Sequence, residues 1–548
     1  MKRVEMTELL DRARRAFESG TWAEAFSRFS AADVEQPLAP EDLEQMAAAA
    51  QLVGADEVAV ATWERAHLQL LGRGEVERAV RCAFWLGYGL LIAGQMARGG
   101  GWIGRAWRLV EENGLECVEE GFLMIPMGLR TLEGGDPARA YEIFGRAIGI
   151  GQRFGETDVV TLGRLGQGRS LVVMGRDAEG LALLDEAMVA VTAREVSPIV
   201  AGRVYCAVIL VCQQAFDLHR AHEWTAALSD WCESQPDIVP FRGLCLVHRA
   251  EVMQWHGQWP EAVAEAKRAL DRLSDPPGQP AVGLAFYQLG ELYRLRGDFA
   301  DAEVAYREAS QYGLAPLPGL AWLRLMQGDA GAAGAAIRRA MGETHDRVTR
   351  AKLLGAGVEI MLAVGDIDAA AEAAAELAVI AAEVDAPVLR AMALQASSAV
   401  SLHRGDPAGA LDAALQAASA WAGLEAPYEH ARSRLLGALA CRDLGDRDAA
   451  HLELDAVRHT LEQLGAAPDL ARVKALFPTA ALPVAGNLTT REIQVLVLVA
   501  RGLTNPEIAS ELAVSTHTVR RHLQNIFHKV DVSSRAAATA FAYEHGLI

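Results

Sequence analysis

Lysine is scarce in this chain of 548 residues, with only five copies at positions 2, 267, 352, 474 and 529. None follows a glycine, so the chain lacks the GxxxxGK[ST] loop that holds nucleotide phosphates. The motifs GxSxG and HExxH are also absent, and no cysteine spacing is typical of a zinc site. These absences argue against nucleotide-hydrolysing, serine-hydrolase and metalloprotease chemistry. We therefore predict a protein that is not an enzyme and that needs no cofactor or metal.

Long apolar runs and paired cysteines are missing as well. The most apolar run, residues 204–211, is too short to span a bilayer. The N-terminus mixes charges early and has no apolar core, so no signal peptide is expected. The seven cysteines are odd in number and form no CxxC pair (82, 117, 206, 212, 232, 245 and 441). We expect free thiols, a cytoplasmic location and no membrane partner.

The net charge of −19 is unevenly distributed. Residues 487–548 hold six Lys or Arg against five Asp or Glu, which leaves 46 basic and 66 acidic residues elsewhere. A negative field over the first 486 residues repels nucleic acid, so any contact with DNA is expected only at the C-terminal end.

The first ~470 residues repeat with a period near 40, which is typical of stacked helical hairpins. In each repeat a turn residue is followed five places later by Ala or Gly at the start of a helix. The turn residues are Gly20, Gly54, Gly94, Gly135, Gly175, Phe216, Gly257, Gly297, Gly328, Gly365, Gly405 and Gly445. Glycine suits a left-handed helix end, and the aspartate after Gly135, Gly297, Gly365 and Gly405 is predicted to cap the next helix. The small residue lets two helices approach closely.

These units resemble tetratricopeptide (TPR) repeats, although their period is longer than the usual 34 residues. The resemblance implies a solenoid of about twelve hairpins, because one hairpin cannot bury its own apolar face. Residues 175–275 are rich in Trp, Cys and His. They either form a ligand or partner surface on the concave side or fill the core between long helices. His219 and His222 have metal-ligand spacing, but no third ligand is evident, so we expect no metal there.

The C-terminal residues predict a compact group of short helices. Thr489 with Glu492, and Thr504 with Glu507, form two capping boxes, and Ser515 caps a third helix. Only Ala513 and Val514 separate the second helix from Ser515, which is typical of a helix-turn-helix. Within residues 515–530 an apolar stripe of Val519, Leu523 and Ile526 is accompanied by basic and polar residues and by no carboxylate. Such a face suits phosphates and base edges.

Residues 488–548 resemble the LuxR-type (GerE-like) helix-turn-helix domain without a gap. The matching positions are Leu488, Thr489, Glu492, Val495, Leu496, Gly502, Asn505, Ile508, Ala509, Leu512, Ser515, Thr518, Val519, His522, Asn525, Ile526, Lys529, Val532, Ser534, Arg535 and 546–548. Arg520 stands where the family usually has lysine, and Val530-Asp531 where it usually has Leu-Gly, so the turn into the last helix is expected to differ.

The resemblance implies a role for each matched residue. Base edges in the major groove of double-stranded DNA would be read by Arg520, Arg521 and Gln524. Phosphate contacts would come from Thr504, Asn505, Ser515, Thr516, Thr518, His522 and Lys529. For His522 a packing role stays equally open. A homodimer, at least on DNA, is expected through the final helix, residues 535–545.

We predict an all-α protein made of a TPR-like α-solenoid at 1–466, a linker at 467–487 and a four-helix LuxR-type domain at 488–548. The expected function is sequence-specific regulation of transcription, controlled by a protein or small-molecule effector on the solenoid. The alternative is a TPR-type interaction scaffold whose terminal domain does not bind DNA specifically.

Overall fold

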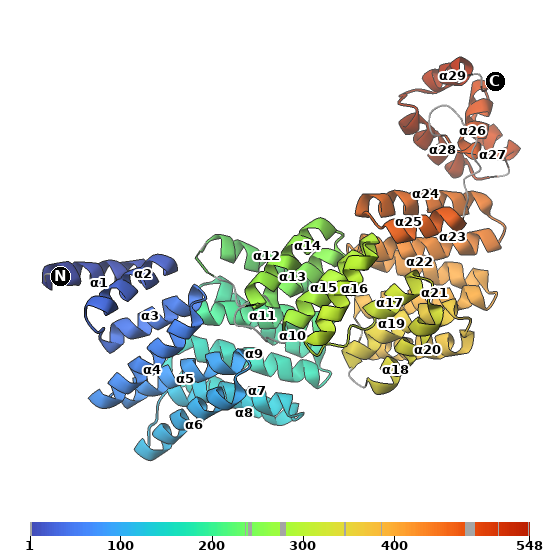
Figure 1. The fold of residues 1–548 in the computed structure, drawn as a ribbon. Coiled ribbons are helices and arrows are strands. Elements are labelled where there is room, and N and C mark those ends of the chain that lie inside the picture. Colours follow the sequence, from blue (N-terminus) through green and yellow to red (C-terminus); the bar gives the residue numbers. More distant parts are fainter. Residues whose placement is uncertain are drawn as a thin grey trace. The chain divides into compact units, whose positions relative to one another are not determined.

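The predicted all-α class is confirmed by a computed structural model of the chain (Figure 1). The structure describes residues 3–235, 237–238, 244–274, 281–344, 347–384, 386–476, 488–512, 514–545 and 547. Within these ranges the chain forms 29 helices and no strand. It divides into two compact units, residues 1–445 with 453–470, and residues 446–452 with 471–548.

The repeat region contains twenty-five helices, most of them 12 to 18 residues long. They are α1 (Arg3–Glu18), α2 (Trp22–Glu35), α3 (Pro40–Leu52), α4 (Asp56–Arg73), α5 (Val76–Ile92), α6 (Met96–Asn113), α7 (Glu119–Glu133), α8 (Pro137–Phe154), α9 (Thr157–Val173), α10 (Asp177–Thr192), α11 (Pro198–Gln214), α12 (Leu218–Glu233), α13 (Leu244–Trp255), α14 (Trp259–Leu273), α15 (Ala281–Arg296), α16 (Phe299–Gln311), α17 (Gly319–Met326), α18 (Ala330–Glu343), α19 (Arg347–Ala363), α20 (Ile367–Val384), α21 (Pro387–His403), α22 (Pro407–Gly423), α23 (Pro427–Asp443), α24 (Arg447–Leu464) and α25 (Ala467–Leu476).

All twelve predicted turns lie between two helices of a pair, from α1 and α2 around Gly20 to α23 and α24 around Gly445. The eleven glycines have positive φ between 75° and 91°, as the left-handed helix end requires. Phe216 takes the same conformation, with φ of 56°, which confirms it as the turn residue of the one repeat without glycine. Twelve hairpins are therefore present, followed by the single helix α25.

A second set of left-handed residues joins one hairpin to the next, and the sequence analysis did not predict it. It consists of Gly74, Gly114, Gly155, Arg194, Gly313, Glu425 and Gly465. Most of these residues follow one another at the same interval of about 40 residues. In the repeats that carry these residues, both turns end a helix in the same way, whereas α2 and α18 are followed by extended residues, Gln36 and Thr344.

Small residues and aspartate caps behave largely as predicted. A Cβ on Gly180 of α10 would lie 2.7 Å from the carbonyl oxygen of Gly168 in α9, so this approach requires glycine. The carboxylates of Asp136, Asp366 and Asp406 accept hydrogen bonds from backbone N–H groups three residues later. The prediction was wrong for Asp298, which makes no side-chain capping bond.

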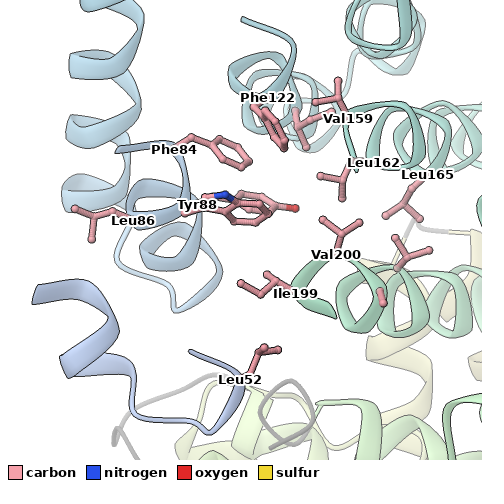
Figure 2. Packing of buried hydrophobic residues seen from close by; sticks show 14 of the residues in the cluster. Leu52, Phe84, Leu86, Tyr88, Phe122, Val159, Leu162, Leu165, Ile199 and Val200 are labelled. Carbon is pink, nitrogen blue, oxygen red and sulfur yellow. The ribbon is translucent and has the colours of Figure 1, made fainter. Parts of the chain in front are cut away.

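The odd-numbered helices of most neighbouring hairpins contact one another and so form one layer of the array. In its N-terminal part their apolar side chains fill that layer. Figure 2 shows aromatic and aliphatic residues of α3, α5, α7, α9 and α11 meeting there, among them Leu52, Phe84, Phe122, Leu162 and Ile199. This part of the layer is therefore a packed core.

The array also coils back on itself, so that hairpins four or five repeats apart are in contact. Helix α3 contacts α11. The Trp22 Nε1–H donates to Gln235 Oε1 at 3.0 Å, and Arg347 pairs with Asp177 at 3.4 Å. A Cβ on Gly257 would lie 2.6 Å from Leu464 Cδ2 and 2.9 Å from Pro427 Cγ. We call this line of contacts between successive coils the seam.

The Trp- and Cys-rich stretch mostly fills the core, which favours the second of its two interpretations. Trp259 and Cys212 are fully buried, and Trp224 and Trp231 pack against the N-terminal core. The expectation of seven free thiols was wrong, because Cys206 is disulfide-bonded. Sequence spacing does not reveal which cysteines packing brings together. Among the described residues, no three His, Cys, Asp or Glu side chains are placed to hold a metal ion, and no described helix is long and apolar enough to cross a membrane.

The C-terminal helices are α26 (Thr490–Ala500), α27 (Asn505–Glu511), α28 (Thr516–Lys529) and α29 (Arg535–Glu544). They surround a core of their own that draws on residues 488–547 alone. We call these four helices the C-terminal module. The domain boundaries stay a prediction. Helix α25 occupies the first ten residues of the predicted linker, and Pro478 and Pro483 lie outside the described residues.

Candidate nucleic-acid interface

Three capping interactions hold the starts of the first three module helices, as the sequence predicts. The Glu492 carboxylate accepts from the backbone N–H of Thr489 at 2.7 Å, and that of Glu507 accepts from Thr504 N–H at 2.6 Å. The Ser515 hydroxyl accepts from Thr518 N–H at 3.0 Å. Hydrogen bonds from Thr504 lower the pKa of Glu507. These caps define the chain path through the helix-turn-helix formed by α27 and α28.

Helix α28 has one buried and one exposed face. Val519, Leu523 and Ile526 are buried in the module core. The three predicted base-reading residues, Arg520, Arg521 and Gln524, are exposed together. Of the predicted phosphate contacts, Thr504, Ser515 and Thr516 are exposed and Thr518 is half-buried. The exposed face thus carries donors and two cations, with no carboxylate on the helix.

Lys529 is engaged inside the module. Its Nζ donates to Oε2 of Glu492 at 2.8 Å, and the Glu492 side chain is only 3% exposed. The same carboxylate oxygen accepts from the Thr489 hydroxyl at 2.9 Å. Lys529 therefore compensates a buried negative charge and joins the end of α28 to the start of α26. A structural role fits this geometry better than the phosphate contact predicted from the family.

His522 is 3% exposed, and neither ring nitrogen has a hydrogen-bond partner within the described structure. Burial lowers its pKa, and Arg491 and Arg521 act in the same direction against Glu492. The ring is therefore neutral at neutral pH. Of the two roles that the sequence left open, this placement favours packing over phosphate contact.

Asn505 is held by a residue to which the sequence analysis gave no role. Arg535, at the start of α29, donates from Nη1 to Asn505 Oδ1 at 2.8 Å and from Nη2 to the carbonyl of Leu503. It thereby joins α29 to the start of α27. Arg491 similarly donates to the carbonyl of Leu512 at the end of α27, at 2.7 Å. Both arginines hold the ends of α27 in place, and only the tertiary structure reveals these partners.

The turn between α28 and α29 has the unusual feature that the sequence indicated. Asp531 takes a left-handed conformation with φ of 52°, at the position where the family usually has glycine. Val532 N–H donates to the carbonyl of Phe527 at 2.9 Å, which closes the helix end. Aspartate thus adopts the conformation that glycine would adopt more easily.

Comparison with known proteins agrees with this geometry. Residues 486–542 match the family described as bacterial regulatory proteins, luxR family. The C-terminal module is a LuxR-family domain. It is 44% identical over 62 residues to the transcriptional regulatory protein LiaR of Bacillus subtilis (strain 168). It is 43% identical over 61 residues to the response regulator protein VraR of Staphylococcus aureus (strain NCTC 8325 / PS 47).

Each of these matches covers 11% of this chain and 29% of the relative, so the likeness is confined to the LuxR-family module. Over most of the chain, the crystal structure of the APC/C hetero-tetramer Cut9-Hcn1 overlaps with a TM-score of 0.40 and 13% identity. That overlap covers 86% of this chain and 91% of the other.

Proposed function

We propose that this protein is a sequence-specific DNA-binding regulator of transcription that acts in the cytoplasm and has no catalytic activity. The observation that carries the proposal is the joint exposure of Arg520, Arg521 and Gln524 on α28, whose opposite face is buried. Because its polar face is exposed and its apolar face is buried in the module, α28 can enter the major groove while the module core stays intact. The luxR-family match of the module supports the same conclusion.

Arg520 and Arg521 suit the O6 and N7 acceptors of guanine, and Gln524 suits N6 and N7 of adenine. Thr504, Ser515, Thr516 and Thr518 surround the starts of α27 and α28. There, helix N-terminal amides, the Thr516 hydroxyl and one hydroxyl of the Ser515–Thr518 pair can hold phosphates and orient the module. The Thr504 hydroxyl already donates to Glu507 at 2.7 Å. Asn505 is expected to assist only through the side-chain nitrogen, since its oxygen already accepts from Arg535.

Two modules are expected to act together as a homodimer on DNA. One module offers few cations, because Arg491, Lys529 and Arg535 are already bonded within it. A handful of phosphate contacts gives weak affinity at physiological salt. Paired half-sites overcome this weakness, and α29 is the helix that we expect to form the dimer contact.

Selection of bound duplexes from a random library by the full-length protein tests the proposal. A single enriched motif with two half-sites is expected. Replacing Arg521 by Ala should lower affinity for that motif by about 1–3 kcal/mol and relax one base position. Arg501→Ala is the matched control, because Arg501 is exposed in the same module but lies outside α28. An equal loss of affinity for the motif in both variants would show that Arg521 does not read a base.

We further propose that the helical repeats sense a ligand or a partner and control the module. A second candidate is an interaction scaffold whose terminal domain binds no specific sequence. The many exposed acidic residues of the repeats and their packed hairpins suit either task. Failure to enrich any duplex, with the module folded, would favour the scaffold.

A further inference from the structure

A cavity of about 560 Å³ opens along the seam of the array, where turns of one coil meet turns of the next. One wall comes from α12 and the turn between α13 and α14, and carries His222, His256 and Gln258. The other comes from the end of α22 and the start of α23, and carries Trp421, Glu425 and His430. Its size is that of a small-molecule site.

Three histidines from three different elements and the acidic residue Glu425 line this cavity, and no lysine or arginine of the described residues does. The rings of His222 and His256 are 4.4 Å apart between centroids. Nδ1 of His256 lies 3.1 Å from the carbonyl oxygen of Glu425. A carbonyl only accepts, so Nδ1 carries the proton and ties the two walls together. Burial lowers the pKa of His256 and of His430.

The starts of two helices also meet at the cavity. Helix α14 begins after Gln258 and α23 begins after Ala426, and neither of these residues caps its helix through a side-chain hydrogen bond. Pro260 in α14 and Pro427 in α23 have no N–H, so the donors are the remaining amides of each first turn. The first amides of a helix carry partial positive charge and favour anions. The imidazoles of His222 and His430 can each donate one hydrogen bond, whereas His256, with its proton on Nδ1, presents Nε2 as an acceptor. Together with the amides, the two donor histidines make the cavity suited to a negatively charged group.

The floor of the cavity is apolar. Trp421 is 1% exposed and stacks on Trp255, with ring centroids 5.7 Å apart and an interplanar angle of 17°. Its Nε1–H already donates to Gln395 at 3.0 Å, and its ring is almost fully covered, so the apolar surface open to a ligand is mainly that of its neighbours. Ala422 and Pro427 widen this apolar surface. A flat apolar group is therefore expected to lie on this side.

We propose that the seam cavity binds a small organic anion, with a carboxylate or phosphate near the histidines and an apolar ring near Trp421. A metal ion is a poorer occupant, because no three His, Cys, Asp or Glu side chains of the described residues are placed to hold one. The ligand bridges hairpins that are distant in sequence and so stabilises the contact between coils. The anion site itself does not depend on the proposed function. Only one part of the inference rests on it, namely that the bound anion is the effector that controls DNA binding.

Calorimetric titration of the full-length protein with benzoate and with phenyl phosphate tests the site. The two probes share a ring and differ in the charged group, so they separate carboxylate from phosphate ligands. We expect saturable binding of at least one probe. The double variant His222→Gln with His430→Gln should weaken it by about tenfold or more. His219→Gln is the matched control, because His219 is an exposed histidine of the same helix α12 that does not line the cavity.

Glu425→Gln provides a change in the opposite direction. Glu425 is exposed, so the variant is expected to fold, and loss of its negative charge should strengthen probe binding by about two- to fivefold. Absence of binding by both probes overturns the proposal. The proposal is also overturned if the affinity for the probes is unchanged both in the double histidine variant and in Glu425→Gln.

The titration contains no DNA, so its outcome is independent of the proposed function. Binding of a probe together with failure to enrich any duplex would leave the site in place and reject the regulator. An enriched duplex whose affinity is unchanged at saturating probe would reject the effector role.

Discussion

Left-handed residues other than glycine mark places where the backbone conformation costs stability. Asp531 is one of them, with φ of 52° between α28 and α29. In this conformation a residue with a Cβ is less stable than glycine by roughly 1 kcal/mol, and the penalty for aspartate is somewhat smaller. The rest of the module, including the bond from Val532 to Phe527, holds it in place.

Asp531→Gly should therefore raise the free energy of unfolding of the module by about 0.5–1 kcal/mol. Thermal unfolding of a fragment of residues 488–548, followed by circular dichroism, measures this effect. Asp531→Ala keeps a Cβ and should give no increase. A lower melting temperature for the glycine variant would contradict the prediction.

His522 predicts how the stability of the module depends on pH. Its pKa is lowered in the folded state because the ring is buried. Above the ordinary histidine pKa of about 6.5 both states are neutral, and the residue adds no pH dependence. As pH falls below that value the unfolded state takes up a proton that the folded state refuses, so stability is lost.

For His522 alone, linkage limits this loss to about 1.4 kcal/mol one pH unit below 6.5. Chemical denaturation of the same fragment at pH 7.5 and 5.5 should show part of this loss. The pH effect should shrink in His522→Leu and persist in His517→Leu, since His517 is exposed on the same helix. An equal pH effect in all three proteins would show that other groups cause it.

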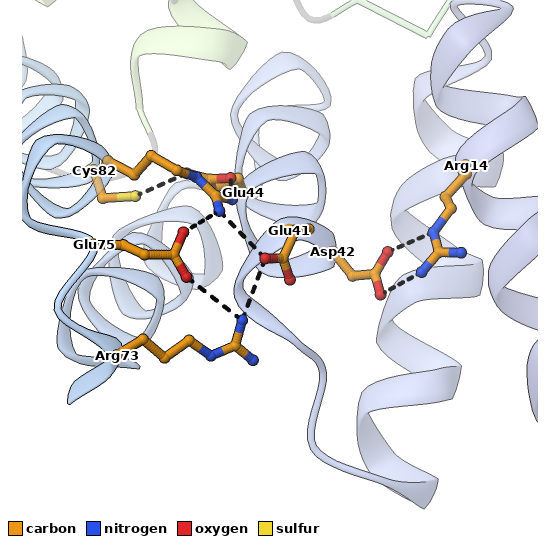
Figure 3. A network of polar contacts seen from close by, with 8 residues as sticks. Arg14, Glu41, Asp42, Glu44, Arg73, Glu75 and Cys82 are labelled. Carbon is orange, nitrogen blue, oxygen red and sulfur yellow. Dashed lines mark hydrogen bonds and ion pairs between the residues drawn. The ribbon is translucent and has the colours of Figure 1, made fainter. Parts of the chain in front are cut away.

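At the scale of helices, ion pairs link hairpins near the N-terminus (Figure 3). Arg14 of α1 donates from Nε and Nη2 to the two carboxylate oxygens of Asp42 in α3, at 2.8 and 2.9 Å. Asp42 is 2% exposed, so its charge depends on this fork of two hydrogen bonds. The network continues through Arg78, which donates to Glu41 and Glu75.

Arg14→Met should lower the local stability of α1 and α3 by about 1–3 kcal/mol, because it leaves a buried carboxylate without its partner. Hydrogen exchange of the amides in these helices measures the change. Arg12→Met is the matched control, since Arg12 pairs with Glu8 on the surface and contributes little. Similar exchange in the two variants would show that Asp42 finds other donors.

At the scale of the whole repeat region, the seam couples hairpins that are far apart in sequence. Gly257 is decisive there, because its turn lies against Pro427 and Leu464. Gly365 has almost the same φ, 82° against 76°, but a Cβ on it would meet nothing within 4 Å. Comparing substitutions at the two glycines therefore distinguishes the effect of backbone strain from the effect of losing the seam contacts.

Gly257→Ala should loosen the seam, whereas Gly365→Ala should only strain one turn. Small-angle scattering is expected to show a larger radius of gyration for Gly257→Ala alone. Hydrogen exchange should increase at the start of α23 in that variant. The same scattering curve for both variants would mean that the seam does not hold the coils together.

Much of the fold was predictable because its signals are local. A left-handed helix end, a capping carboxylate and an apolar stripe each depend on a few consecutive residues. The twelve turns, the capping boxes of α26 and α27, and the buried face of α28 were therefore found from sequence. Phe216 was placed correctly from the period alone. The missing cap at Asp298 shows that a local signal still depends on side-chain geometry.

The sequence by itself determined that this protein is an all-helical array followed by a short helix-turn-helix module, since periodicity and caps need no distant partner. The matching positions of residues 488–548 added the resemblance to the LuxR-type domain. Only the tertiary structure decided which side chains meet across the array and within the module. The seam cavity joins residues about 170 positions apart in the chain, between His256 and Glu425. The burial of His522 and the pairing of Lys529 with Glu492 likewise depend on how helices pack, and spacing along one helix does not encode that packing.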